Sequence, residues 1–333
     1  MARCKGAKLD WLQKAILNNP VLIMMRHLLQ WHGWIQLELL LHHFLGIEIY
    51  QDDGGVFICQ KNYAKKILTK FGMADCNSVA TPLIVNEKLM KEDGGKKVDA
   101  THYRSLVGNL LYLTATRPDL MFAASLLSRF MNSPSHFHLG ATKRVMRYIQ
   151  GTADYGIRFE RQNKVMLVGY CDSDWAGCTD DMKSTSGYVF SFGSGVFSWL
   201  SKKQESVAQS SAEAENIAAS LTTKQAIWLQ HILEDVGEKQ KGAIELYCDN
   251  KSAIAIAKNP VYHSRTKHIV VKYHFIHEAI EDGVVELKYC RIKEQVTDIF
   301  AKALPRAKFQ QLREALGVQK QHIKGENVTD NVQ

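Results

Sequence analysis

The second half of the chain predicts an α/β fold in which a mixed five-stranded β-sheet carries helices on its faces. Short runs of alternating apolar and polar residues mark strands, and longer runs with apolar residues every three or four positions mark helices. In chain order these are three strands, a helix, a strand, two helices, a strand and a final helix. The strands are expected at 165–172, 186–192, 195–201, 243–248 and 284–291, and the helices at 211–236, 251–258, 267–281 and 296–316.

The first of these strands runs directly into acidic residues. The alternating run in LVGYCDSDWAG, at 167–177, leads to Asp172 and Asp174. A buried strand that ends in an acidic residue places a carboxylate at the edge of a sheet, where a cation can hold it. Aspartate at a strand end is also a common turn former, so this position alone is weak evidence for a site.

The helix expected at 211–236 has a well-defined start. Ser210 and Ser211 are good N-cap residues, and Glu213 and Glu215 follow in the first turn, where acidic side chains favour the helix dipole. One face of this helix is apolar and is expected to pack on the sheet. It is formed by Ile217, Leu221, Trp228, Ile232 and Val236.

The first half of the chain predicts a β-hairpin followed by helices. The run HFLGIEIYQDDGGVFICQ, which starts at His43, has the pattern of a strand, an Asp-Gly turn and a second strand. A helix is expected at 63–71, and the polar segment 74–99 is typical of an exposed connector. Three further helices precede a domain boundary that we place close to Gly156. They are expected at 103–115, 118–130 and 135–149.

Composition places the chain among ordinary globular proteins with a moderate basic excess. The 333 residues are 46% hydrophobic and 23% charged, and the formal net charge is +8. That excess favours a polyanionic partner without proving one. Seven cysteines without a CxxC pair, in a chain without a secretory signal, predict reduced thiols and an intracellular protein, in the cytoplasm or the nucleus. The most apolar early run, 21–25, is too short to span a membrane, so no membrane partner is expected.

Three later acidic residues have settings similar to that of Asp172. Glu215 opens a helix, Asp249 ends an apolar strand, and Asp298 opens a C-terminal helix. Four carboxylates from four separate elements repel one another unless a cation holds them together. The pattern therefore favours a divalent metal site.

Several ordered blocks carry a resemblance to a known family. FLGIEI at 44–49 and the segment 103–134 resemble the palm hairpin and the thumb and connection region of a reverse transcriptase. DSDWAGCTDDMKSTSGYVF, SWLSKKQESVAQSSAEAE, CDNKSAIAIAKNPVYHSRTKHI and EQVTDIFAKAL resemble ribonuclease H blocks. Together they are similar to the C-terminal part of a copia-type LTR retrotransposon Pol polyprotein.

The resemblance covers residues 37–317 and implies a domain order. Residues 1–36 are unmatched, 37–156 correspond to a partial, mostly helical reverse transcriptase with a β-hairpin, 157–317 to a ribonuclease H domain of ribonuclease-H-like fold, and 318–333 to a polar tail. It also implies a metal-dependent endonuclease that hydrolyses the RNA strand of RNA–DNA hybrids. Two Mg²⁺ ions, or Mn²⁺ in their place, would serve as cofactors.

Carried over by position, the family's four catalytic and metal-binding acids fall on Asp172, Glu215, Asp249 and Asp298. Asp172 is expected to bridge both ions, Glu215 and Asp249 to hold the ion on the leaving-group side, and Asp298 to hold the ion that activates water. Two close neighbours remain alternatives for these roles. They are Asp174 and Glu213.

Polar residues beside the metal ligands are candidates for contacts to the hybrid. Serine, threonine and asparagine groups could reach the 2′-hydroxyls of RNA, and basic groups could hold phosphates. For any one of these residues an ordinary solvated role is about as good an interpretation. The candidates are Ser173, Ser184, Thr185, Ser186, Lys202, Lys203, Asn250, Arg265 and Lys267.

The chain departs from the family in two respects. YCRIKEQVTD lacks the histidine that many ribonucleases H carry just before the last acid. The polymerase palm motifs are also missing, so polymerase activity is not expected. Tyr50-Gln51-Asp52-Asp53 has the letters of a polymerase motif, but it lies after FLGIEI and continues into Gly54-Gly55, which favours a hairpin turn.

Two other functions stay open at the level of sequence. The chain could be a catalytically inactive, nucleic-acid-binding remnant of a retroelement, which the lost palm and the missing histidine favour. It could also be a scaffold whose residues 37–150 dock a reverse-transcriptase partner chain. Cleavage of a hybrid separates the first from an active nuclease, and co-purification of a partner tests the second.

Overall fold

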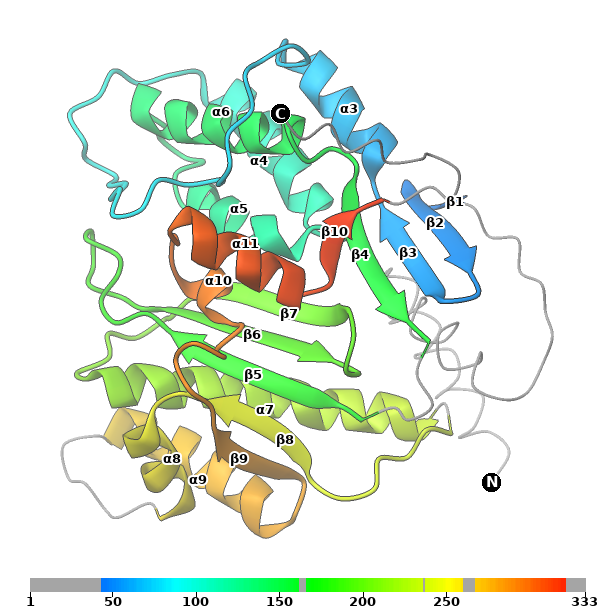
Figure 1. Ribbon diagram of the computed structural model, residues 1–333. Helices are drawn as coiled ribbons and strands as arrows, with labels where there is room; N and C mark the ends of the chain where they lie inside the picture. The colour runs from blue at the N-terminus through cyan, green and yellow to red at the C-terminus, as the bar shows by residue number, and fades with distance from the viewer. Residues whose placement is uncertain (1–42, 162–165, 236, 260–266, 322–333) are drawn as a thin grey trace, which may run out of the picture.

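The computed structural model describes residues 43–161, 166–235, 237–259 and 267–321. The predicted unmatched segment at 1–36, most of the predicted tail, and Arg265 lie outside these residues. The described residues form two five-stranded sheets, each with its own helices (Figure 1). We refer to them as the N-terminal sheet and the C-terminal sheet.

The N-terminal sheet is antiparallel and starts with the predicted hairpin. Its strands run in the order β1 (His43–Phe44), β2 (Ile47–Asp52), β3 (Gly55–Cys59), β4 (Tyr155–Glu160) and β10 (Val318–Lys320).

Asp52 pairs with Gly55, so Asp53 and Gly54 form the two-residue turn that the sequence predicts in place of a polymerase motif. The Asp52 carboxylate accepts a hydrogen bond of 2.8 Å from Arg158 of β4, which occupies it in an ion pair. Gly55 is required because a Cβ there would lie 2.0 Å from the carbonyl oxygen of Phe159.

Helices cover the N-terminal sheet. They are α3 (Lys61–Lys70), α4 (Ala100–Leu113), the 3₁₀ turn η1 (Pro118–Leu120), α5 (Met121–Ser128) and α6 (His136–Gln150). Asp99 caps α4 by accepting from the Thr101 backbone N–H, and Ser135 caps α6. The connector 74–99, all of which is described, contains no helix or strand apart from one isolated bridge between Lys97 and Ser135.

A buried ion pair lies beneath these helices. Arg117 donates to both carboxylate oxygens of Asp119, at 2.9 and 2.8 Å, and the two residues are 1% and 2% exposed. Tyr148 of α6 donates to the same carboxylate at 2.7 Å. Arg313, from the C-terminal helix α11 (Arg306–Ala315), donates to the Tyr148 hydroxyl at 3.2 Å. The network thus connects the N-terminal helices to an element nearly 200 residues later in the chain.

The C-terminal sheet confirms the predicted α/β fold. Its order is β7 (Val196–Lys203), β6 (Thr185–Ser191), β5 (Val168–Ser173), β8 (Ile244–Cys248) and β9 (Val285–Tyr289). The first three strands are antiparallel to one another, whereas β5, β8 and β9 are parallel. This mixed sheet, with β5 at its centre, is the ribonuclease-H-like fold.

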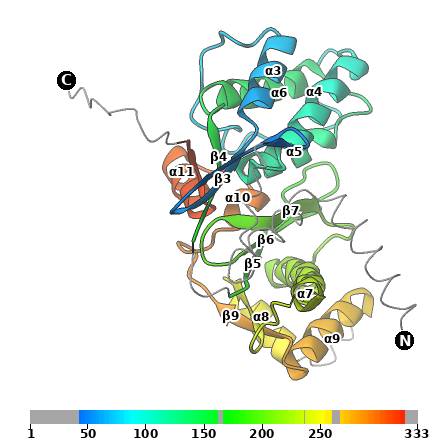
Figure 2. The ribbon, with the colours of Figure 1, turned by 90° about the vertical axis from the view of Figure 1, so that its right-hand side faces the viewer.

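Helices lie on both faces of the C-terminal sheet. The long helix α7 (Ser211–Asp235) packs on one face, together with α8 (Lys251–Lys258) and α9 (Lys267–Glu281). On the opposite face α10 (Asp298–Ala301) contacts β5 and β6, and α5 of the N-terminal half contacts β7 (Figure 2). The two halves of the chain therefore pack against each other through the sheet. Among the described residues, helices that are both long and apolar enough for a membrane span are absent.

The structure differs from the sequence expectations near the C-terminus. The helix expected at 296–316 is two helices, α10 and α11, because Pro305 cannot continue a helix and instead precedes α11. The expected boundary at 156/157 falls inside β4, and residues 318–320 of the expected polar tail form β10. These two short strands pair with each other, with Val318 opposite Ile157, and both residues are fully buried.

Candidate functional site

Four acidic residues are delivered to one edge of the C-terminal sheet by four elements. Asp172 lies near the carboxyl end of β5, and Asp249 directly follows the parallel strand β8. The register pairs Tyr170 with Tyr247, so the two aspartates, each two residues further on, leave the sheet side by side. Glu215 comes from the first turns of α7, and Asp298 is the first residue of α10. The predicted placement of each acid on its element is confirmed.

Burial and mutual repulsion perturb these carboxyl groups. Burial, followed by the Asp298 and Asp249 charges, raises the pKa of Asp172 to about 7, while Lys302 opposes this rise. Burial and the Asp172 charge raise the pKa of Glu215 well above its usual range, and burial and Asp298 raise that of Asp249. Each acid thus lies within electrostatic reach of the others.

Asp298 differs from the other three because two lysines neutralise it. Burial alone would raise its pKa, but hydrogen bonds from Lys302 and Lys308 lower it. Lys302 Nζ lies 2.5 Å from Asp298 Oδ1, and Lys308 Nζ contacts Asp298 Oδ2. Lys302 Nζ is also 3.9 Å from Asp172 Oδ2. The lysines offset part of the negative charge on this side of the site.

The donor set suits a hard divalent cation. Ligand atoms of Glu215, Cys248 and Asp249 all lie within 4.8 Å of one another, and this group of described residues includes neither Asp172 nor Asp298. Asp172 is 2% exposed, and no described residue makes a hydrogen bond to its Oδ2 atom. Because a buried, unpartnered carboxylate oxygen is costly, this atom points to a cationic partner. Asp172, Glu215, Asp249 and Asp298 supply the oxygen ligands that Mg²⁺ or Mn²⁺ prefers.

The two alternative acids have other partners. Asp174 Oδ1 accepts a hydrogen bond from the backbone N–H of Thr185, and burial raises the pKa of Asp174 to about 6. A Cβ at Gly177 would lie 1.6 Å from Asp174 Oδ2, so this glycine lets the loop close over the carboxylate. Glu213 accepts from the backbone N–H of Gln209 at 3.1 Å, at the start of α7. Both residues hold local backbone.

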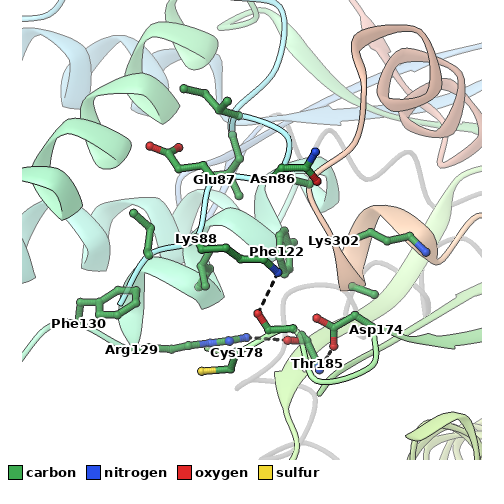
Figure 3. Close-up of a pocket in the computed structure, with 17 residues that line it drawn as sticks. Asn86, Glu87, Lys88, Phe122, Arg129, Phe130, Asp174, Cys178, Thr185 and Lys302 are labelled. Carbon is green, nitrogen blue, oxygen red and sulfur yellow. Dashed lines mark hydrogen bonds between the residues drawn. The ribbon is translucent and has the colours of Figure 1, made fainter. Parts of the chain in front are cut away.

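A cavity of about 120 Å³ lies beside the acidic cluster, between the connector, α5 and the loop that follows β5. Lys88 and Arg129 point toward this loop, where Lys88 donates to the Gly177 carbonyl at 3.3 Å and Arg129 donates to the Thr185 hydroxyl at 3.0 Å (Figure 3). Asp174 and Lys302 also line it. The N-terminal half of the chain therefore supports the loop next to Asp172.

The predicted hydroxyl contacts are buried in the described structure. Gln204 donates to the hydroxyls of Ser173 and Ser186, at 3.1 and 2.9 Å. The Ser184 hydroxyl accepts from the Ala176 backbone N–H. These side chains, like that of Thr185, are at most 8% exposed and are part of the buried interior next to the acids. This placement argues against direct contact between these hydroxyls and a nucleic acid.

The remaining predicted contacts have varied settings. Lys202 is exposed and pairs with Glu205, and Lys203 is half-buried and pairs with Asp181 at 2.8 Å. The Asn250 side chain caps α8 by accepting from the Ala253 backbone N–H. Lys267 opens α9, but its side chain, like all of Arg265, lies outside the described residues.

Sequence reasoning missed Lys302, Lys308 and Gln204. Lys302 follows Asp298 by four positions, a spacing that places two helical side chains together and could have identified it. Lys308 reaches Asp298 only because the chain turns at Pro305, and Gln204 reaches Ser173 only through the pairing of β6 and β7. Local sequence carries no signal for either contact.

The raised pKa of Asp172 predicts how stability depends on pH in EDTA. The native pKa of about 7 lies above that of an unfolded aspartate, about 3.9, so the native state binds the proton more tightly. The contribution of this group to stability is complete below about pH 4 and is lost as the pH rises toward about 7. Wild type should therefore lose melting temperature relative to Asp172→Asn over this range. A constant difference between the two proteins would contradict the prediction.

Comparisons with known proteins agree with this architecture. Residues 34–85 match the family model for reverse transcriptase (RNA-dependent DNA polymerase). Over 278 residues the chain is 40% identical to the retrovirus-related Pol polyprotein from transposon RE2 of Arabidopsis thaliana, which covers 84% of this chain and 19% of the relative. The corresponding protein from transposon TNT 1-94 of Nicotiana tabacum is 38% identical over 284 residues, or 82% of this chain and 21% of that protein.

A shorter relative and a solved structure also match. The secreted RxLR effector protein 161 of Plasmopara viticola is 49% identical over 128 residues, which are 38% of this chain and 90% of that protein. LC11-RNase H1, isolated from compost, is similar at 14% identity with a TM-score of 0.32, covering 41% of this chain and 94% of its own. The chain spans about a fifth of the length of the two transposon proteins. With its reverse-transcriptase match and its ribonuclease-H-like sheet, it is similar to one part of the retrovirus-related Pol polyproteins of transposons.

Proposed function

We propose that this chain is a Mg²⁺-dependent endonuclease that hydrolyses the RNA strand of RNA–DNA hybrids. The observation that carries the proposal is the buried Asp172, whose Oδ2 atom accepts no hydrogen bond from a described residue, has Lys302 Nζ at 3.9 Å, and lies among three further acids at the edge of the ribonuclease-H-like sheet. Structural cores do not usually leave such an oxygen without a partner. A site that gathers metal ligands explains it.

In this proposal each acid has one task. When bound, a pair of Mg²⁺ or Mn²⁺ ions supplies an activated water and charge stabilisation for phosphodiester hydrolysis. Asp172 interacts electrostatically with each of the other three acids and would hold both ions. Glu215 and Asp249 would hold the ion on the leaving-group side, and Asp298 would hold the ion that activates the attacking water. The Ser173 backbone N–H, 3.3 Å from Glu215 Oε1, orients that carboxylate.

Cleavage of a defined substrate tests the proposal. The purified full chain, incubated with Mg²⁺ and a labelled RNA–DNA hybrid, should cut the RNA strand and leave the DNA strand intact. EDTA should stop the reaction, and Mn²⁺ should restore it. A folded protein that binds the hybrid in a salt-dependent, EDTA-insensitive way without turnover would instead support the inactive remnant. Polymerase activity is not part of the proposal.

Two further expectations belong to this proposal. We infer an intracellular location, in the cytoplasm or the nucleus, which the free cysteines support, since the six in the described residues form no disulfide. A reverse-transcriptase partner chain is the second expectation, and residues 37–150 would dock it. Co-purification from cells that express the element tests both.

A further inference from the structure

Lys302 is the side chain that contacts both Asp172 and Asp298 of the acidic cluster. It follows α10 directly as the C-cap residue, and its Nζ atom is 2.5 Å from Asp298 Oδ1 and 3.9 Å from Asp172 Oδ2. Its side chain is 45% exposed, whereas the side chains of Asp172 and Asp298 are 3% and 0% exposed. A partly exposed positive group therefore lies beside two buried carboxylates.

The contacts of the two carboxylates show why this position matters. Asp298 has a second cation, Lys308, on its other oxygen. Asp172 has no comparable substitute, because none of the described residues hydrogen-bonds to its Oδ2, and Lys302 is the cation recorded closest to that atom. Although burial alone would lower the pKa of Lys302, the Asp172 and Asp298 charges raise it. The ammonium group thus provides the positive charge between these two acids.

We propose that Lys302 is a positioning residue that acts as a built-in cation on the Asp298 side of the site, and that a divalent ion binds there only by displacing it. The inference rests on the proposed function, because it concerns the same four acids. It predicts two unequal ion positions. The Glu215–Asp249 side has no lysine contact in the described structure and binds first, while the Asp172–Asp298 side competes with an ammonium group.

The structure gives Lys302 a way out of the site. Its half-exposed side chain lines the cavity beside Asp174, so the ammonium group can move toward solvent without crossing the core. Lys308 keeps one charge on Asp298 when Lys302 leaves, which limits the repulsion between the acids before the ion arrives. Lys302 therefore adjusts how tightly the second ion binds.

Calorimetric titration of the full chain with Mn²⁺ alone, without nucleic acid, tests this inference. Wild type should show a tighter and a weaker binding event. Lys302→Met removes the charge but keeps the length of the side chain, and it should tighten the weaker event by about tenfold while leaving the tighter one unchanged. Lys302→Gln provides a second uncharged replacement, and Lys302→Arg, which keeps the charge, should retain the weaker event.

Lys320→Met is the matched control. Lys320 pairs with Asp154 at 3.6 Å on β10, away from the acids, so its loss should change neither dissociation constant. A second measurement is the melting temperature in EDTA. Lys302→Met should melt below wild type there, because Asp172 and Asp298 lose their shared partner, and Mn²⁺ should raise its melting temperature more than that of wild type.

The inference is overturned if both uncharged variants keep the weaker dissociation constant of wild type, or bind Mn²⁺ more weakly. The second result would mean that Lys302 assembles the site rather than competing with an ion. The binding assay is independent of turnover. A protein that fails to cut the hybrid but shows the tenfold shift contradicts only the nuclease, and one that cuts the hybrid without the shift contradicts only the role of Lys302.

Discussion

Asp172→Asn is expected to lower the rate of hybrid cleavage by at least about 10³-fold, because it removes the carboxylate that would hold both ions in the proposed mechanism. Asparagine keeps the shape of the side chain and mimics the protonated acid, so the sheet should remain intact. The variant should even gain stability in EDTA at neutral pH, because Asp172 has a pKa raised to about 7 by burial. Initial cleavage rates at saturating Mg²⁺ measure the effect.

Asp174→Asn is the matched control, two residues after Asp172 and directly after β5. Its carboxylate accepts from the Thr185 backbone N–H, which fixes the loop instead of facing the four acids. We expect a loss of no more than about tenfold, the size of one neutral hydrogen bond. Equal losses in the two variants would move the bridging role to Asp174 and would refute our assignment. Far-UV circular dichroism of both proteins checks that each is folded.

Arg117→Met is expected to destabilise the protein by about 3–5 kcal/mol, the usual cost of leaving one partner of a buried ion pair uncompensated. Among the described residues, Asp119 would keep the hydrogen bond from the Tyr148 hydroxyl and the more distant charge of Arg313, and the Thr152 carbonyl and hydroxyl would lose the Arg117 donors at 2.7 and 2.9 Å. Urea unfolding followed by circular dichroism measures the change in the free energy of unfolding.

An exposed ion pair of the same chemistry provides the control. Arg158 bonds to Asp52 across β4 and the hairpin, and their side chains are 19% and 42% exposed. Because water screens this pair, Arg158→Met should cost no more than about 1 kcal/mol. The double variant Arg117→Met with Asp119→Asn should recover part of the loss, since no buried charge is left unpaired. An Arg117→Met variant as stable as Arg158→Met would show that the network contributes little.

Much of the C-terminal sheet, and the element that carries each of the four acids, could be predicted because each signal is local, whereas their assignment as one catalytic set came from the family resemblance. Alternation fixes which residues of a strand face the core, and Asp172 and Asp249 stand where that alternation stops. The N-cap at Ser210 and Ser211 fixes where α7 starts, and so places Glu215 in the first turns of the helix. No long-range information is needed for any of these assignments.

The features that sequence did not predict depend on partners far away in the chain. β4 is a strand through its pairing with β3 of the hairpin, and the three-residue β10 is a strand through its pairing with β4, about 160 residues earlier in the chain. The Thr185 and Ser186 hydroxyls looked available for a nucleic acid, but the fold places Arg129 and Gln204 against them. Only the overlooked Lys302 had a local signal, its spacing from Asp298.

The return of β10 to the N-terminal sheet makes the nuclease-like half an insertion. In the sequence it lies between β4 and β10, two neighbouring strands of the N-terminal sheet. Two backbone hydrogen bonds join the ends of the insertion to this sheet, from Arg158 N–H to the Gly317 carbonyl at 2.9 Å and from Val196 N–H to the Leu316 carbonyl at 3.1 Å. A single cleavage of the polypeptide anywhere in 166–316 would therefore leave each fragment missing a strand or a helix that the other holds. Loss of β10 would spare every acid and still leave β4 as an uncovered edge of the N-terminal sheet.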